Sequence, residues 1–294
     1  MNFIPFAILG YSLTAGALIV DKILLRHSIP NPFVYAFYIN LLGLFALFLI
    51  PFGASFDANG IFFGTVSGIL YVFALVTMFQ ALKHGEASVV GPVVGALNPL
   101  FTLIILALFF SQSLNQSEFI GFFVLIFGAL ILTFDLWSKG LKLNNQLFWI
   151  IISGVFWALS YITLKQTFEY SNFFGGLVIT RAAAGLFVLP WLLFPAFRKH
   201  VFPRTKKSST PILLFLGQAM GAMSGIFINF GVLLANPALV NSLFGVQYLV
   251  ILTVALLLNK NNPHLLDEKL TKATILQKTI GVIVLSFGVY LLSK

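Results

Sequence analysis

The sequence predicts an all-α integral membrane protein, and three observations carry this prediction. The chain of 294 residues is 59% hydrophobic and only 9% charged, whereas soluble domains are about 25% charged. Its mean hydropathy is +1.01, so polar side chains are too few to cover a water-exposed surface. The apolar runs are continuous and lack the alternation of barrel strands, which favours bundled helices. A cytosolic enzyme and a nucleic-acid partner are excluded, because both need charged surface that this chain lacks.

Ten apolar runs have the length of about 20 residues that a helix needs to cross a bilayer. Charged residues, Asn or Pro separate them. The uncharged stretch 208–259 is too long for one span, and we divide it at Pro237 because proline ends a helix. The predicted spans are 3–25, 33–53, 61–82, 88–110, 118–136, 146–165, 173–196, 211–234, 238–258 and 275–292.

The two halves of the chain resemble each other. Ile120–Gly128 aligns with Ile280–Gly288, and Lys22 and Lys165 end the first and sixth spans at equivalent positions. The matching order of segments predicts an internal repeat of five helices. Because five is odd, the second repeat enters the membrane from the opposite side, so the ten helices form two inverted repeats. The predicted domains are 1–137 and 138–294.

The basic residues lie mainly in the loops on the face opposite the termini. Arg198–Lys207 and Lys260–Lys278 are rich in Lys and Arg, whereas the equivalent loops of the first half contain none. This reversal is what inverted insertion requires. The net charge of +9 is therefore interpreted as a topology signal and a contact surface for lipid headgroups.

Two sequence patterns resemble a known family. Trp157–Lys165 reads W-A-L-S-Y-I-T-L-K and resembles the signature that opens a repeat of the EamA family, in the drug/metabolite transporter superfamily. In the first half, Ala87-Ser88 followed by Pro99, Gly121 and Gly128 is similar to the layout that closes such a repeat. The resemblance covers nearly the whole chain, and two such repeats account for all ten predicted spans.

The sequence also departs from the family pattern. Thr14 stands where the first repeat would have Trp, and Leu249 stands where the second would have Pro. The family usually keeps both termini in the cytoplasm, whereas the loop charges place them outside. The absolute orientation is therefore left open.

The resemblance implies a multi-pass protein of the plasma membrane that exports small metabolites, such as amino acids or related solutes, by alternating access. Its expected partners are a small-molecule substrate and membrane lipids, with no cofactor. Two alternatives remain: a membrane scaffold without transport activity, and an enzyme acting on lipid. The enzyme is disfavoured because the chain shows no catalytic or metal-binding cluster, His84 beside Glu86 being the nearest to one.

Ionisable residues inside the spans are the strongest site signal, because each costs about 2.5 to 3.5 kcal/mol on insertion. Arg181 is the leading candidate, since its forked donors suit a carboxylate or phosphate. It could instead bind carbonyls or reach the headgroups. Lys22 and Lys165 either line the cavity or end their helices at the interface. Asp21 is either a coupling group for protons or the ion partner of Lys22.

Uncharged residues extend the predicted pathway. Amides within apolar runs need partners, which are either a substrate or a neighbouring helix. Aromatic residues either form a cavity wall or face lipid. Two prolines predict a kink in the fourth span, where an interrupted helix would expose backbone groups. The amides are Asn40, Gln80, Asn98, Gln218, Asn229 and Gln247; the aromatic residues are Tyr11, Tyr71, Trp157, Tyr161 and Tyr248; the prolines are Pro92 and Pro99.

Overall fold

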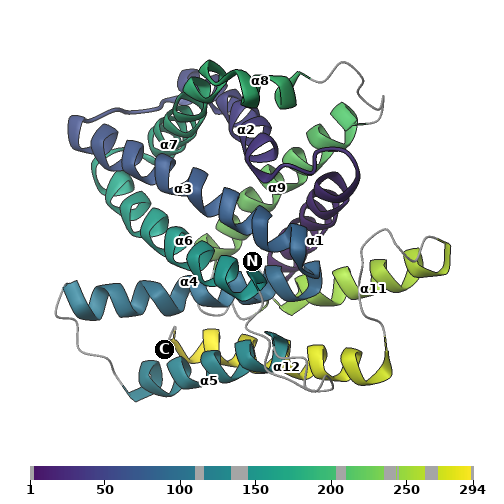
Figure 1. Ribbon diagram of the computed structural model, residues 1–294. Helices are drawn as coiled ribbons and strands as arrows, with labels where there is room; N and C mark the ends of the chain where they lie inside the picture. The colour runs from purple at the N-terminus through teal and green to yellow at the C-terminus, as the bar shows by residue number, and fades with distance from the viewer. Residues whose placement is uncertain are drawn as a thin grey trace.

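The computed structural model describes residues 3–109, 116–133, 145–202, 210–234, 243, 245–261 and 271–292, and every regular element in them is a helix (Figure 1). The first half contains α1 (Ile4–His27), α2 (Pro32–Gly43), the 3-10 helix η1 (Leu44–Phe52), α3 (Ala58–His84), α4 (Ala87–Phe109) and α5 (Gln116–Thr133). The second half contains α6 (Asn145–Tyr170), α7 (Phe173–Val188), the 3-10 helix η2 (Leu189–Leu193), α8 (Pro195–Val201), α9 (Thr210–Leu234), α11 (Gly245–Asn261) and α12 (Lys272–Leu292).

The helices confirm the all-helical membrane class. Within the described residues, seven helices are long and apolar enough to cross a membrane, and three further apolar helices are shorter. These elements coincide with the ten predicted runs, although the division at Pro237 lies outside the described residues. The run 173–196 differs in detail. Its α-helix ends at Val188, and the 3-10 helix η2 follows, with Pro190 as its second residue. Proline has no backbone N–H to continue the α-helical bonding.

Local sequence explains where several helices begin. The side chain of Asn31 accepts a hydrogen bond from Phe33 N, and Pro32 follows it at the first helical position of α2. Asp57 accepts from the first turn of α3, and Asn172 accepts from Gly175 N in α7. These side chains satisfy backbone donors that have no partner inside the helix.

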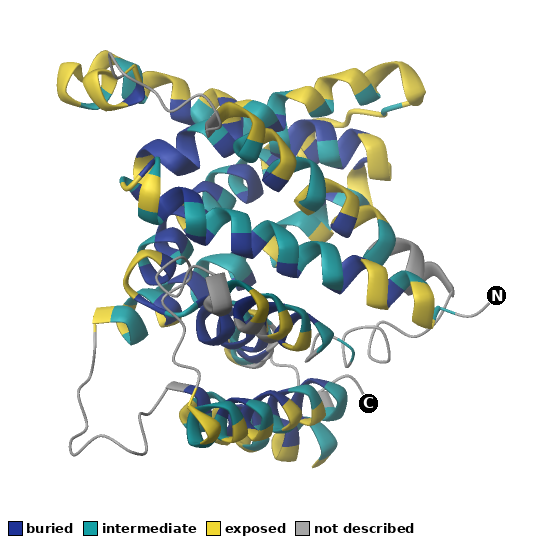
Figure 2. Cartoon of the chain, turned by 90° about the vertical axis from the view of Figure 1, so that its right-hand side faces the viewer, coloured by how far each residue is buried: buried dark blue, intermediate teal, exposed yellow. Residues whose placement is uncertain are grey.

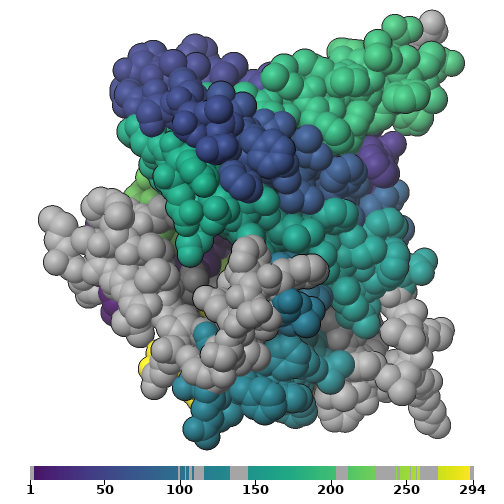
Figure 3. Space-filling view, turned by 90° about the vertical axis from the view of Figure 1, so that its left-hand side faces the viewer, coloured from purple at the N-terminus to yellow at the C-terminus, as the bar shows by residue number. Residues whose placement is uncertain are grey.

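The helices pack in pairs that join the two halves of the chain. α3 packs along α6, α1 packs along α9, and α5 packs along α12 (Figure 1). In addition, α6 contacts α4, α1 contacts α11, and α2 contacts α7. Figure 3 shows α3 and α6 lying side by side across one face of the molecule. Segments distant in sequence are therefore held together by direct helix packing.

Polar contacts strengthen these pairs. Ser67 Oγ donates to Ser160 O at 2.8 Å, and Ser160 Oγ donates to Ser67 O at 3.0 Å, which links α3 to α6. Thr14 and Ser224 form a hydroxyl pair between α1 and α9. In an apolar surrounding such contacts hold helices together, because lipid offers no competing partner.

The crossing of α5 and α12 is reciprocal. A Cβ atom at Gly128 would lie 2.8 Å from Leu285 Cδ2, and one at Gly288 would lie 2.8 Å from Leu125 Cδ2. In both cases the backbone nitrogen of the same leucine is 3.0 Å away. Each glycine thus admits the leucine of the other helix, and the two backbones approach closely.

The outer surface is apolar. Figure 2 shows exposed residues along the outer sides of the helices and buried residues toward their contacts. Phe48 is 73% exposed and Leu193 is 81% exposed, a degree of exposure that suits contact with lipid chains. The described surface therefore agrees with the membrane class inferred from composition.

The fourth span forms a single helix, and the predicted kink at its two prolines stays a prediction. α4 is one continuous helix from Ala87 to Phe109 and includes both Pro92 and Pro99. A proline removes a single backbone hydrogen bond, and neighbouring helices can support the remainder of the turn. Pro92 is buried, whereas the side chain of Pro99 lies outside the described residues.

Candidate functional site

The predicted arginine lies against an aromatic ring from the other half of the chain. Arg181 is on α7 and half-buried, and its Cζ atom is 4.1 Å from the centroid of the Tyr71 ring on α3. Its stem packs toward Gly43 of α2. The contact is a cation–π interaction, which stabilises a partly desolvated guanidinium.

Two further aromatic residues extend this contact along α6. Tyr71 meets Trp157 edge to face, with centroids 5.3 Å apart, and Trp157 stacks on Tyr161 at 5.6 Å. Tyr161 also lies near Arg181, and Tyr11 of α1 lies near Tyr161. We call Arg181, Tyr71, Trp157 and Tyr161 the Arg-aromatic cluster.

The cluster contains polar donors without acceptors among the described residues. The guanidinium of Arg181 makes no hydrogen bond or ion pair within the part of the chain that the structure describes. Trp157 Nε1 is buried and has no hydrogen-bond partner there either. A buried donor without an acceptor costs about 1 to 3 kcal/mol. Such groups are therefore suited to bind an acceptor supplied by a ligand.

Acidic side chains lie outside the cluster. In the described ranges, Asp57 caps α3, Glu118 lies in the first turn of α5, and Glu169 lies in the last turn of α6. Asp21 and Glu86 have the partners given below. Within the described residues, the guanidinium of Arg181 therefore contacts the Tyr71 ring and no carboxylate.

Asp21 forms a second polar site. It accepts a hydrogen bond from Tyr35 OH of α2, and its Oδ1 atom lies 3.8 Å from the position of a Cβ at Gly217 of α9. Asp21 therefore lies where α1, α2 and α9 meet. Its observed partner is Tyr35, a residue that no sequence pattern singled out.

The two lysines that occupy equivalent sequence positions have different environments. Lys22 is buried, and its Nζ donates to Leu82 O at 2.7 Å and to Gly85 O at 2.5 Å. It therefore neutralises the carbonyl end of α3, in keeping with the helix dipole. Lys165 is exposed on α6.

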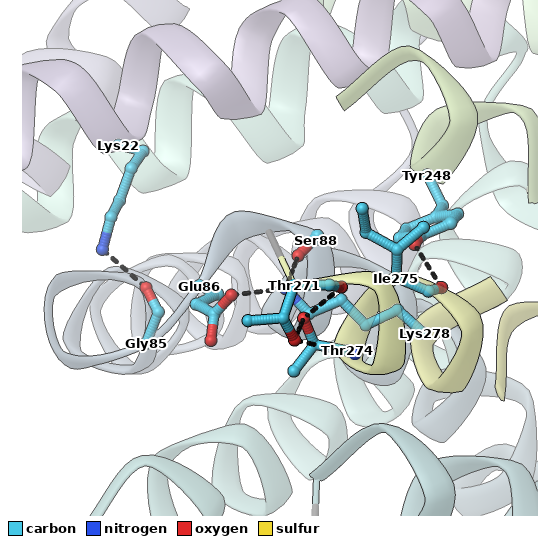
Figure 4. A network of polar contacts seen from close by, with 9 residues as sticks. All are labelled: Lys22, Gly85, Glu86, Ser88, Tyr248, Thr271, Thr274, Ile275 and Lys278. Atoms are coloured by element: carbon cyan, nitrogen blue, oxygen red, sulfur yellow. Dashed lines mark hydrogen bonds and ion pairs between the residues drawn. The ribbon is translucent and has the colours of Figure 1, made fainter. Parts of the chain in front are cut away.

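A polar network surrounds the turn between α3 and α4 (Figure 4). Lys278 of α12 forms an ion pair with Glu86 and donates to Ser88 Oγ at 2.9 Å, while Lys22 reaches Gly85 from α1. The side chains of Lys278 and Glu86 are 6% and 19% exposed. Beside them, Tyr248 is fully buried and its hydroxyl lies 3.5 Å from Ile275 O, so it links α11 to α12.

A smaller set of contacts joins the halves at the other end of α3. Ser55 N donates to Asn172 Oδ1 at 3.1 Å, and Asn172 N donates to Ser55 Oγ at 2.9 Å. Asn172 Nδ2 also donates to Gly53 O at 2.6 Å. Gly53 has φ of +90°, a conformation that favours glycine, and it ends η1. The tight turn lets the chain reach Asn172.

The predicted amides are spread over several interfaces. Asn40 is buried and donates to Ala36 O, while its Oδ1 atom has no partner among the described residues. Asn98 Oδ1 is likewise buried without a partner there. Gln247 is buried against Gly91, and Gln80 and Gln218 are half-buried on α3 and α9. The side chain of Asn229 lies outside the described residues.

Sequence reasoning missed several of these contacts. Lys278 carried a usable signal, because it is a charged residue inside the apolar run 275–292. Tyr35 and Asn172 carried none, since their partners are distant in sequence. No group of three or more potential metal ligands occurs among the described residues.

Comparison with known proteins agrees with this architecture. Residues 2–134 match the EamA-like transporter family, whose members are membrane transporters rather than enzymes. Among solved structures 28 chains match. One, described as "Crystal structure of protein", is 17% identical with a TM-score of 0.56, covering 97% of this chain and 93% of its own. No curated protein matches the sequence. The expected resemblance is confirmed for the first half, and the solved structure supports the fold along nearly the whole chain.

Proposed function

Because residues 2–134 belong to the EamA-like transporter family of the drug/metabolite transporter superfamily, we propose that the chain is a secondary transporter that exports small solutes by alternating access. It acts in the plasma membrane, with ten spans arranged as two inverted repeats, 1–137 and 138–294. The observation that carries the site is the contact of Arg181 with Tyr71 between the two halves.

The pairing of helices supports the inverted repeats. α1, the first helix of the first repeat, packs on α9 and α11, which are the third and fourth spans of the second repeat. In the same way α6, the first helix of the second repeat, packs on α3 and α4, the third and fourth spans of the first repeat. α5 with α12 and α2 with α7 pair equivalent helices. The reciprocal insertion of Leu285 at Gly128 and Leu125 at Gly288 is also expected for two repeats related by a two-fold axis.

The substrate site lies at the Arg-aromatic cluster. Tyr71 comes from the first repeat, while Arg181, Trp157 and Tyr161 come from the second, so movement of the repeats against each other changes the cluster. Binding sites between repeats are typical of secondary transporters. The aromatic side chains provide an apolar wall, and Arg181 provides the polar anchor for the solute.

The contacts at the two ends of α3 act as alternating closures. Ser55 with Asn172 lies before α3, and Glu86 with Lys278 lies after it, and each pair joins the two repeats. α3 has 27 residues, so these closures are about 40 Å apart along its axis. Opening one closure while the other holds gives the solute access from one side at a time.

Counterflow in proteoliposomes tests the proposal. The purified protein is reconstituted into liposomes that are loaded with unlabelled small metabolites. Entry of a labelled solute into these vesicles is then measured for the wild type and for Arg181→Ala. Exchange that requires the protein and is lost in Arg181→Ala supports transport at this site. A folded protein without exchange for any solute would contradict it and favour the scaffold alternative.

A further inference from the structure

The Arg-aromatic cluster has the composition of a selective anion site. Its two donors, the Arg181 guanidinium and Trp157 Nε1, lack acceptors among the described residues. The guanidinium and the Trp157 ring both contact Tyr71. The rings of Tyr71, Trp157 and Tyr161 supply an apolar wall next to these donors. The cluster thus combines two hydrogen-bond donors, one positive charge and apolar surface.

We propose, as a refinement that rests on the proposed function, that this cluster binds the carboxylate of a solute with an apolar body and without a cationic group. Two N–H groups of the guanidinium donate hydrogen bonds to the carboxylate oxygens. Trp157 Nε1 donates a further hydrogen bond, and the apolar body packs on Trp157 and Tyr161. The carboxylate supplies the acceptors that the cluster lacks.

Selectivity against zwitterions follows from charge. An α-amino acid carries an ammonium group within a few ångströms of its carboxylate, so binding would place a second positive charge beside Arg181. The described acidic residues all lie outside the cluster. Asp21 is hydrogen-bonded to Tyr35, and Glu86 is paired with Lys278. The others lie at helix ends: Asp57 before α3, Glu118 in the first turn of α5, and Glu169 in the last turn of α6. Repulsion in a partly buried site weakens binding of the zwitterion by at least about tenfold.

The aromatic rings do not replace the missing carboxylate. A ring can attract an ammonium group through its face, but Arg181 already covers one face of Tyr71. The ring planes of Trp157 and Tyr71 meet at 84°, and those of Trp157 and Tyr161 meet at 26°. The adjoining ring surfaces therefore contact each other. The charge of the cluster is therefore best complemented by a net monoanion.

Matched ligand triplets test this inference on the purified full-length chain. The probes are 3-phenylpropanoate, phenylalanine and 3-phenylpropanamide, together with the smaller set butanoate, 2-aminobutanoate and butanamide. Affinity is measured from the concentration dependence of the melting temperature. In at least one triplet, we expect the carboxylate to bind at least about tenfold more tightly than both the zwitterion and the neutral amide.

Three variants locate the effect. Arg181→Gln is expected to abolish the preference for the carboxylate over the amide. Trp157→Phe keeps an aromatic side chain but removes the Nε1–H donor. We expect it to weaken carboxylate binding about tenfold, as for the loss of a hydrogen bond to a charged group. Lys199→Gln removes an exposed positive charge on α8 and is the charge-matched control, with unchanged binding.

The outcomes separate this inference from the proposed function. Equal or tighter binding of the amino acids, no stabilisation by either carboxylate, or a preference retained in Arg181→Gln would overturn the inference. Flux of an amino acid with no carboxylate binding would leave the transporter standing and refute the anion site. Carboxylate binding without flux in proteoliposomes would support the anion site and refute transport.

Discussion

Glu86, at the turn between α3 and α4, forms an ion pair with Lys278 of α12, and the two side chains are 19% and 6% exposed. Ser88 Oγ accepts a second hydrogen bond from Lys278 at 2.9 Å. The pair joins the first half of the chain to the second, so its geometry depends on how the halves are positioned. A buried pair of this kind holds one arrangement, because separating the charges leaves each without its partner.

Removing either charge of this pair is expected to destabilise the protein. Glu86→Gln or Lys278→Met should each cost about 3 kcal/mol, because each takes the opposite charge away from a largely buried group. The double variant should lose less than the sum of the single losses. Thermal unfolding in detergent measures the coupling energy as a double-mutant cycle. Additive losses would mean that the two side chains do not act as a pair.

The contact at the other end of α3 can be tested by cross-linking. The chain has no cysteine, so Ser55→Cys with Asn172→Cys introduces the only thiols. Because each of these residues hydrogen-bonds the backbone N–H of the other, we expect a disulfide to form under oxidation. Flux should stop in the cross-linked protein and return on reduction.

The single-cysteine variants are the controls for this experiment, and oxidation should leave their flux unchanged. Cross-linked protein that transports at the rate of the reduced form would show that this closure does not open during transport. That result would contradict the alternating role of the two closures.

The α5–α12 crossing should not tolerate added side-chain volume. A Cβ at Gly128 or Gly288 would lie 3.0 Å from the backbone nitrogen of the facing leucine, and backbone cannot yield as a flexible side chain does. Gly128→Ala and Gly288→Ala are each expected to lower stability by about 1 to 3 kcal/mol. Melting temperatures measure the effect.

Gly95 offers a matched control within a helix. A Cβ there would meet no atom within 4 Å, so Gly95→Ala should be neutral or stabilise by about 0.5 to 1 kcal/mol through the helical preference of alanine. Equal destabilisation by all three variants would show that the crossing is not the cause.

Much of the fold was predictable from the sequence, because lipid imposes simple rules on length and hydropathy. The ten apolar runs and the helical class came from these rules, whereas the family resemblance came from two sequence motifs. α4 runs through both Pro92 and Pro99 as one helix, and the sequence alone could not predict this, since neighbouring helices decide whether a proline divides a span. The end of α7 at Val188 differed for a related reason, because Pro190 favours a 3-10 turn there.

The candidate site was predictable only in part. Arg181, Tyr71, Trp157 and Tyr161 were each selected for charge or aromaticity inside a span, and the structure brings them together. Their contacts could not be predicted, because they lie on α3, α6 and α7 and depend on helix packing. Lys22 was selected by the same rule, and its bonds to the carbonyl end of α3 could not be predicted either, because they depend on how α1 packs against α3.

Any acceleration of flux by a pH gradient is expected to depend on Asp21. This carboxyl group lies between α1, α2 and α9 and accepts a hydrogen bond from Tyr35. Asp21→Asn retains an acceptor for Tyr35 but cannot exchange a proton. Flux measured with and without a pH gradient should therefore become equal in this variant.

Asp57→Asn is the control for this comparison. Asp57 caps α3, and asparagine caps a helix about as well as aspartate, so its response to the gradient should match the wild type. Gradient-driven flux that persists in Asp21→Asn would assign the proton to another group.

The central claim is that Arg181 holds the anionic group of a transported solute at the contact between the two halves. The most direct measurement is the uptake of the radiolabelled carboxylate that binds more tightly, 3-phenylpropanoate or butanoate, by proteoliposomes containing the wild type, Arg181→Gln or the charge-matched Lys199→Gln. We predict saturable uptake for the wild type and Lys199→Gln, and a loss of at least about tenfold for Arg181→Gln. Saturable uptake by Arg181→Gln at the wild-type rate would contradict the claim.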